Sequence, residues 1–235
     1  MSSGRNCCAV IAAAGASSRM DLGFSKQFVL LLGVPAIART LLAFEAAREV
    51  GSVVVVCREE DRGRMELAVR GCGAGKVAAI VPGGGTRQRS AAAGAAAVPP
   101  GTEWIAVHDG ARPLIRPEEI DACVSAAREY GAAALAVPVK DTVKLTDGEG
   151  FVSSTPRRER LWAVQTPQVF RLALYREAMR SAEAAGADYT DDCQLLERCG
   201  VRIRLCRGSY ENLKLTTPDD VAAAEAILRR REELS

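Results

Sequence analysis

The chain has 235 residues, of which 48% are hydrophobic and 26% are charged, and its formal net charge is +2. This length suffices for one α/β domain with a sizeable core, and the charge balance excludes a general attraction to nucleic acid or membrane, so any anion must be bound locally. No apolar run approaches the roughly 18 residues of a membrane span, and the N-terminus lacks a basic segment before a long apolar one. We therefore expect a soluble, cytoplasmic protein with neither a nucleic-acid nor a membrane partner.

Strand-like and helical segments alternate along the first 130 residues. Strands are expected at Cys7–Ala12, Ser52–Cys57, Val77–Val81 and Trp104–His108, and helices at Ala36–Glu49, Glu59–Arg70, Thr86–Val98 and Pro117–Tyr130. In the first helix the spacing predicts that Ile37, Leu41, Leu42 and Phe44 point inward. Because continuous apolar strands joined by helices indicate a parallel sheet covered on both faces, we expect a Rossmann-like α/β fold.

The pattern changes after the apolar segment Ala132–Val139. Residues 140–160 alternate apolar and polar side chains around a plausible turn, Thr146-Asp147-Gly148-Glu149-Gly150, which predicts an extended β-arm. An isolated two-stranded arm is marginally stable, so it should pack on another surface such as a second subunit. The remaining elements are expected as strands at Trp162–Phe170, Val201–Cys206 and Asn212–Leu215 and helices at Leu172–Ala185, Asp191–Cys199 and Pro218–Arg230. We predict a single domain, residues 1–235, with residues 139–160 as the protruding arm.

The loop after the first strand is the most informative segment. Ala13, Ala14 and Gly15 are small, so a ligand can approach the backbone N–H groups closely, and Arg19 and Lys26 follow with positive charge. This combination is suited to a polyphosphate. The segment matches neither the GxxxxGK[ST] nor the GxGxxG pattern.

A second loop, Pro82-Gly83-Gly84-Gly85-Thr86-Arg87-Gln88-Arg89-Ser90, leads from a strand into a helix. Its three glycines permit positive φ and close approach of a ligand, so backbone groups and the Ser90 hydroxyl could read the edge of a base. The alternative is a simple strand-to-helix turn in which Arg87 and Arg89 are solvated.

A third loop follows the strand that ends at His108. Asp109 could hold Mg²⁺ against phosphate oxygens, and Arg112 could brace the loop or an anion; otherwise Asp109 is a turn or helix cap. For His108, the only histidine, a hydrogen-bonded structural role is favoured over catalysis. Because ligands bind beyond the carboxyl ends of parallel strands, we expect all three loops to form one site.

Two further groups of residues fit phosphate chemistry. Thr142, the basic run 157–160 and Thr166 suit a phosphate monoester, although such a run is also typical of a solvated face. Lys214, predicted at a strand end, should be tied to a ligand or an acid. No serine or cysteine nucleophile with a matching histidine is evident, and a phosphate nucleophile needs none, because it is largely dianionic at neutral pH.

Taken together, seven ordered motifs resemble one enzyme family over nearly the whole chain. They are AAAGASSRM…SKQF (12–28), PGGGTRQRS (82–90), VHDGARP (107–113), DTVK (141–144), RRERLWAVQTPQVF (157–170), TDD (190–192) and NLKLTTPDD (212–220). The chain thus resembles the 2-C-methyl-D-erythritol 4-phosphate cytidylyltransferases of the non-mevalonate isoprenoid pathway. The resemblance implies a nucleotide-diphospho-sugar transferase-like fold and a homodimer that exchanges its arms. The implied reaction uses CTP and Mg²⁺ and yields 4-diphosphocytidyl-2-C-methyl-D-erythritol and pyrophosphate by in-line attack of the substrate phosphate on the α-phosphate of CTP.

The resemblance also implies a role for each matching residue. Ala13, Ala14, Gly15, Arg19 and Lys26 would surround the triphosphate of CTP, with Arg19 and Lys26 stabilising the α-phosphorus and Lys214 contacting the phosphates. Gly84, Gly85 and Ser90 would read cytosine, Gly110 would approach the ribose, and Asp109 would bind Mg²⁺. Thr142, Arg158 and Thr166 would hold the methylerythritol phosphate, Thr142 and Arg158 serving the neighbouring subunit.

Two other functions compete with this interpretation. A ribitol-5-phosphate cytidylyltransferase has similar loops, but such relatives tend to carry Val where this chain has Ala111. A non-catalytic nucleotide-binding regulator would be expected to lose Lys26, Asp109 or Lys214, and all three are present.

Overall fold

The computed structural model describes residues 6–15 and 25–234. A seven-stranded sheet forms its centre, in the order β11-β7-β10-β6-β1-β4-β5. The strands are β1 (Cys7–Ala13), β4 (Val50–Cys57), β5 (Val77–Pro82), β6 (Trp104–Asp109), β7 (Ala132–Pro138), β10 (Trp162–Arg171) and β11 (Arg204–Arg207). All neighbours in this sheet are parallel except that β10 runs antiparallel to both β6 and β7. The expected mostly parallel α/β fold is confirmed.

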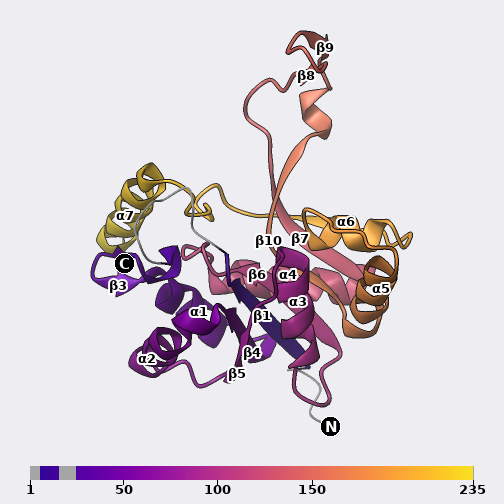
Figure 1. Ribbon diagram of the computed structural model, residues 1–235. Coiled ribbons are helices and arrows are strands. Elements are labelled where there is room, and N and C mark those ends of the chain that lie inside the picture. Colours follow the sequence, from indigo (N-terminus) through magenta and orange to yellow (C-terminus); the bar gives the residue numbers. More distant parts are fainter. Residues whose placement is uncertain (1–5, 16–24, 235) are drawn as a thin grey trace.

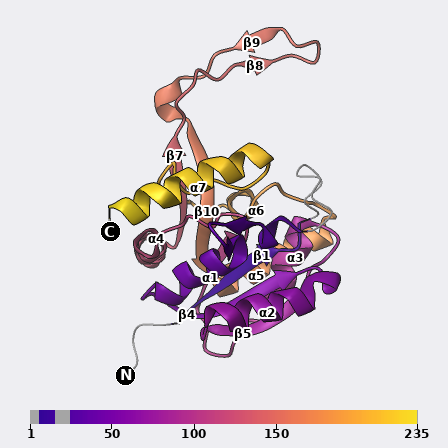
Figure 2. The same cartoon turned by 90° about the vertical axis from the view of Figure 1, so that its left-hand side faces the viewer.

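Helices cover both faces of the sheet, as the continuous apolar strands require (Figures 1 and 2). One core lies against α1 (Ala36–Ala46), α2 (Arg62–Cys72) and α4 (Pro117–Tyr130), and the other against α3 (Arg87–Ala96), α5 (Leu172–Ala184) and α6 (Asp192–Glu197). Alternate residues of β1 serve the two cores: Ala9 and Ile11 face the first, and Cys8 and Val10 the second.

A third, smaller core lies under the C-terminal helix α7 (Pro218–Glu233). Leu215, Ala224 and Leu228 pack there against Leu31 and Leu114. Thr217 and Asp220 form a capping box with Pro218 at the first helical turn, so the helix begins where its sequence predicts. Short elements of the same region are the 3₁₀ turn η1 (Lys26–Phe28) and a hairpin of β2 (Leu30–Leu31) and β3 (Val34–Pro35), which the sequence analysis did not foresee.

Several predicted boundaries shift. Helix α1 ends at Ala46 rather than Glu49, and Leu42 is 43% exposed, so its inward assignment was wrong; Ile37, Leu41 and Phe44 are buried. The segment expected as one helix from Glu59 is a 3₁₀ turn, η2 (Glu59–Asp61), followed by α2.

The arm between β7 and β10 projects away from the body of the molecule (Figure 1). It is less regular than predicted: only β8 (Leu145–Thr146) and β9 (Val152–Ser154) pair near its tip, and η3 (Arg158–Arg160) is a 3₁₀ turn. Asp147 accepts backbone N–H bonds from Glu149 and Phe151, which closes the expected turn.

In the described part of the chain, no helix combines the length and the apolar character needed to cross a membrane. The expected cytoplasmic location stays a prediction.

Candidate active site

Three loops at the carboxyl ends of the parallel strands β1, β5 and β6 meet around one cavity of about 340 Å³. Its lining comes from the ends of β1 and β6, from the turn that begins α3, and from two residues more distant in sequence: Ala12, Ala14, Gly15, Gln27, Gly84, Gly85, Thr86, Arg87, Ser90, Asp109, Ala111 and Lys214. The parallel arrangement of β1, β4, β5 and β6 brings these loops to one edge. The expectation of a single site is therefore supported by the geometry.

The glycine-rich loop is built for close approach. None of Gly83, Gly84 and Gly85 has a positive φ, so the loop does not use the left-handed backbone that these glycines permit. Instead, a Cβ on Gly83 would lie 2.4 Å from Ala14 Cβ, and one on Gly84 would lie 2.5 Å from Arg89 Cβ. The loop can therefore press against the β1 loop and against its own helix only without side chains.

Ser90 fastens this loop. Its side chain is buried, accepts the Gly84 N–H at 3.1 Å and donates to the Thr86 carbonyl at 2.9 Å. Thr86 caps α3 by accepting the Arg89 N–H. The hydroxyl predicted to contact a base is thus also the group that shapes the loop.

Asp109 is the charged centre of the cavity. Its Oδ2 lies 2.9 Å from Lys214 Nζ and 3.4 Å from Arg112 Nε, and its side chain is only 14% exposed. Burial alone would raise the pKa of this carboxyl, but the charges of Lys214 and Arg112 outweigh burial and lower it to about 2. Asp109 is therefore an anion at all physiological pH values.

Lys214 reaches Asp109 from an irregular segment, so the strand predicted at Asn212–Leu215 is wrong. The Leu215 N–H bonds the Ala111 carbonyl at 2.8 Å, but the segment does not join the sheet. The expectation that Lys214 is tied to an acid is confirmed by its contact with Asp109.

Thr166 and His108 lie directly behind Asp109. The Asp109 N–H donates to Thr166 Oγ1 at 3.0 Å, and the same oxygen lies 3.0 Å from His108 Nδ1. His108 is fully buried, and this burial lowers the pKa of its ring to about 4, so the ring is neutral at pH 7. The predicted hydrogen-bonded structural role of His108 agrees with this geometry.

The other predicted residues fall into three groups. Ala13 and Gly110 are close together but do not line the cavity; a Cβ on Gly110 would be 3.1 Å from Ala13 Cβ. Lys26 begins η1 beside the lining residue Gln27, whereas Arg19 lies outside the described residues. Thr142 and Arg158 are exposed on the arm and do not line the cavity of their own chain.

The sequence did not predict the surroundings of Arg87; the one suggestion made for this residue was that its side chain is solvated. Arg87 lines the cavity, and its guanidinium pairs with the buried carboxylate of Asp192, which also accepts the Tyr175 hydroxyl at 2.8 Å. Burial by itself would lower the pKa of Arg87, but the negative charge of Asp192 outweighs burial and raises this pKa above its usual range. The TDD motif at 190–192 was the available signal, since an acid there needs a cation once buried.

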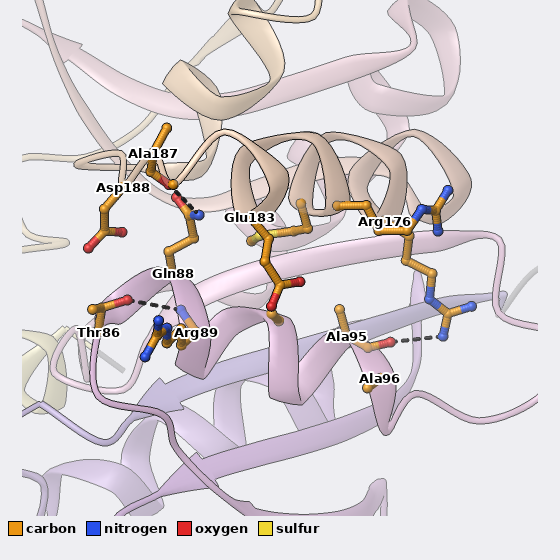
Figure 3. A pocket seen from close by; sticks show the side chains of 13 residues that line it. Thr86, Gln88, Arg89, Ala95, Ala96, Arg176, Glu183, Ala187 and Asp188 are labelled. Carbon is orange, nitrogen blue, oxygen red and sulfur yellow. Dashed lines mark hydrogen bonds between the residues drawn. The ribbon is translucent and has the colours of Figure 1, made fainter.

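The next arginine of α3 faces elsewhere. Figure 3 shows Arg89 and Gln88 at a separate cavity of about 480 Å³ between α3 and α5, where Gln88 donates to the Ala187 carbonyl at 3.0 Å and Arg176 to the Ala95 carbonyl at 2.8 Å. Among the described residues, Thr86 alone lines both cavities. Arg87 and Arg89 are therefore neighbours in sequence with different surroundings.

The donor set limits how a metal could bind. Among residues 6–15 and 25–234, no group of three or more His, Cys, Asp or Glu side chains is arranged to hold a metal ion. Asp109 is a single carboxylate whose two ion pairs both use Oδ2. It fits an ion that takes one protein ligand and completes its shell with substrate and water, as Mg²⁺ does.

Comparison with known proteins identifies one family. Residues 7–230 match the family described as 2-C-methyl-D-erythritol 4-phosphate cytidylyltransferase. Enzymes of that name from Desulforamulus reducens and Geobacillus kaustophilus are 48% and 46% identical, over 96% and 95% of this chain and 97% of each relative.

Solved structures extend the likeness to the fold. The 4-diphosphocytidyl-2C-methyl-D-erythritol synthase of Anaerococcus prevotii is 29% identical, with a TM-score of 0.86 over 96% of this chain and 97% of that one. The cytidylyltransferase of Thermus thermophilus is 32% identical, with a TM-score of 0.75 over 94% and 98%. Together with the loops that meet at Asp109, these matches show that the chain belongs to the 2-C-methyl-D-erythritol 4-phosphate cytidylyltransferase family.

Proposed function

We propose that the cavity at Asp109 is the CTP site of the reaction that this family catalyses. The chain is a transferase that moves the cytidylyl group of CTP to 2-C-methyl-D-erythritol 4-phosphate and releases pyrophosphate. The observation that carries the assignment of the site is the meeting of two glycine-lined loops with Asp109 and Lys214 in one cavity.

The small-residue loops hold the nucleotide. Backbone groups at Ala14 and Gly15 approach the triphosphate, and Gly84 and Gly85 leave room for the cytosine, because no side chain separates these backbones from the cavity. Ser90 keeps the glycine loop in shape through its bonds to Gly84 and Thr86.

The cations neutralise charge as the bond to the α-phosphorus forms. The attacking phosphate is already largely dianionic at neutral pH, so the reaction needs positioning and charge neutralisation rather than a general base. Lys214 lies beside the cavity, and Lys26 and Arg19 supply further positive charge from the first loop. Ala13 and Gly110 allow the loops after β1 and β6 to pack closely beneath the nucleotide.

Asp109 is the residue that would hold Mg²⁺. Its carboxylate is ionised, lies at the cavity and has one oxygen outside the contacts with Lys214 and Arg112. When bound there, the ion neutralises phosphate charge and orients the triphosphate.

The first test is pyrophosphate release with CTP and Mg²⁺, comparing methylerythritol phosphate with ribitol 5-phosphate. We expect release with the former, and release with ribitol 5-phosphate alone would overturn the substrate assignment. Lys214→Met and Lys26→Ala should each lower kcat by about 10²-fold or more, as loss of a preorganised charge contact does elsewhere. Arg89→Gln, which alters the separate cavity of Figure 3, is the matched control and should remain active.

The arm serves a second subunit in this proposal. Leu145, Phe151 and Val152 are between 52% and 69% exposed near its tip, an apolar surface that a partner would cover. Residues 139–160 would then act as a dimerisation arm of an otherwise single domain. Thr142 and Arg158, from this arm, would hold methylerythritol phosphate in the neighbour's cavity. Thr166 is buried behind Asp109 and does not line the cavity, so it would act on that substrate only through Asp109.

Mixed dimers test this arrangement. Lys214→Met disables the cavity, and Arg158→Ala disables the arm. If the arm acts in the neighbouring site, each mixed dimer regains one intact site, and random mixing restores about a quarter of wild-type activity. Two inactive preparations that stay inactive after subunit exchange would show that Arg158 serves its own chain.

A further inference from the structure

A closed set of hydrogen bonds runs behind the Asp109 carboxylate. Asp109 N–H donates to Thr166 Oγ1 at 3.0 Å, which lies 3.0 Å from His108 Nδ1, while His108 Nε2 lies 3.3 Å from the Arg112 carbonyl. Arg112 Nη1 donates to the Asn212 carbonyl at 2.7 Å, and Asn212 Nδ2 donates to the Thr166 carbonyl at 3.0 Å. The set joins the end of β6, the middle of β10 and the segment that carries Lys214.

The direction of each bond at the histidine follows from the groups themselves. The Arg112 carbonyl can only accept, so Nε2 must carry the proton of the neutral ring. Nδ1 is then an acceptor, and the Thr166 hydroxyl donates to it while accepting the Asp109 N–H. One tautomer thus satisfies every member of this part of the set.

His108 is held firmly in that orientation. Its ring is 0% exposed and lies against Phe44, with ring centroids 5.0 Å apart and planes tilted by 59°. It contacts both ends of the turn from Asp109 to Arg112, one through the Thr166 hydroxyl and the other through the Arg112 carbonyl. An apolar side chain would fill the same space but would make neither bond.

We propose that His108 is a positioning residue for cytidylyl transfer. It fixes the turn from Asp109 to Arg112, and through Arg112 and Asn212 it fixes the segment that presents Lys214 to Asp109. This role rests on the proposed function of the Asp109 cavity. It acts through geometry alone, because His108 lies behind the carboxylate and does not line the cavity.

Two substitutions, each of which keeps one of the two hydrogen bonds of His108, test whether the hydrogen bonds or only the volume of the ring is needed. His108→Asn places an amide oxygen where Nδ1 accepts from Thr166, and His108→Gln can place an amide N–H where Nε2 faces Arg112. His108→Phe keeps a ring and loses both bonds. We expect His108→Phe to lower kcat by about 10- to 10²-fold, as small misplacements of catalytic groups do, and to leave the KM for CTP within about threefold of the wild-type value. His108→Asn and His108→Gln should each have a higher kcat than His108→Phe.

Val107→Ala is the matched control, since Val107 is equally buried on the same strand and makes only apolar side-chain contacts there. It should lower the melting temperature and leave kcat at 25 °C unchanged. Phe, Asn and Gln variants that lose stability but keep wild-type kcat would overturn the proposal and leave His108 a core residue. Should the Phe variant not fold, the comparison of Asn and Gln with wild type decides the question in the same way.

Nitrogen NMR of the ring provides a readout independent of activity. In the wild-type protein we expect the neutral tautomer with the proton on Nε2, and in Thr166→Val we expect the Nδ1 resonance to shift as its donor is lost. A proton on Nδ1 in the wild type would overturn the assigned direction of the bonds. Inactive wild-type enzyme with the expected tautomer would instead count against the proposed function.

Discussion

Gly94 gives the sharpest test of how packing supports the active site. It lies within α3, and a Cβ there would be 2.3 Å from Val10 Cγ1 and 2.8 Å from Val56 Cγ2. Both valines are fully buried in central strands and are β-branched, so neither can turn aside easily. Gly94→Ala must therefore push α3 away from the sheet.

Two opposing effects set the change in folding stability that Gly94→Ala should cause. Replacing a helical glycine by alanine gains about 0.8–1 kcal/mol of helix propensity. The 2.3 Å contact is more than 1 Å shorter than an ordinary one, and overpacking of this kind costs about 1–3 kcal/mol or more. Because this contact is so short, we take the cost at about 3 kcal/mol, the upper end of that range. Gly94→Ala should then lose about 2 kcal/mol net, or about 4–8 °C in melting temperature.

Gly71→Ala in α2 is the matched control, because a Cβ on Gly71 meets nothing within 4 Å. It should gain about 0.5–1 kcal/mol. Urea unfolding of both variants measures the difference, which we expect to be about 3 kcal/mol. Because α3 begins at Arg87, directly after the glycine loop, Gly94→Ala should also raise the KM for CTP, whereas Gly71→Ala should not. Equal stability of the two variants would refute the packing argument.

Three other substitutions test the polar groups. Thr166→Val leaves His108 Nδ1 and the Asp109 N–H without a partner, so it should lower the free energy of unfolding in urea by about 2–5 kcal/mol. Thr166→Ser keeps the hydroxyl and should lower it far less. Equal losses of stability in the two variants would contradict the hydrogen-bond account. Asp192→Asn removes the countercharge of the partly exposed Arg87 and should lower the free energy of unfolding by about 2–4 kcal/mol. A double-mutant cycle with Arg87→Met should show a coupling energy of about 1–3 kcal/mol. Additive effects of the two substitutions would mean that the ion pair contributes nothing to stability. Glu211 is paired with Arg116, Arg230 and Arg231, and these arginines lower its pKa from 4.5 to about 2 despite partial burial. The contribution of Glu211 to folding stability is therefore complete above pH 4.5 and declines as the pH falls toward 2. After allowance for solvent screening, Glu211→Gln should cost about 1 kcal/mol at pH 7 and less at pH 3.5, and a cost that does not change with pH would argue against the ion pairs.

Much of the fold follows from local patterns. The strands β1, β4 and β6 contain continuous apolar runs because both of their faces are buried, and the edge strand β5 is only partly buried but also apolar, so all four can be recognised without tertiary information. Helix α7 begins at Thr217 and Pro218, where the cap and the proline act within one turn. The loops that follow the strands were therefore predictable as the edge where the site lies.

Other features depend on contacts between distant segments. Asn212–Leu215 has the composition of a strand, but the segment makes its backbone contact with Ala111 in a loop rather than with a strand, so no ladder forms. Leu42 fits the helical period yet lies at the surface, since the apolar face of α1 is narrower than its sequence suggests.

At the site itself, the residue types and the loops that carry them can be read from local patterns, because small residues, glycines and charges act through local chemistry. The partners of these residues depend on how distant segments pack. Asp109 meets Lys214 and Thr166 across more than fifty residues of chain, and Arg87 meets Asp192 across more than a hundred. The Thr166 contact arises because β10 enters the sheet antiparallel between β6 and β7, a choice of neighbours that no single segment specifies, and the other two pairs join segments that meet only in the folded chain.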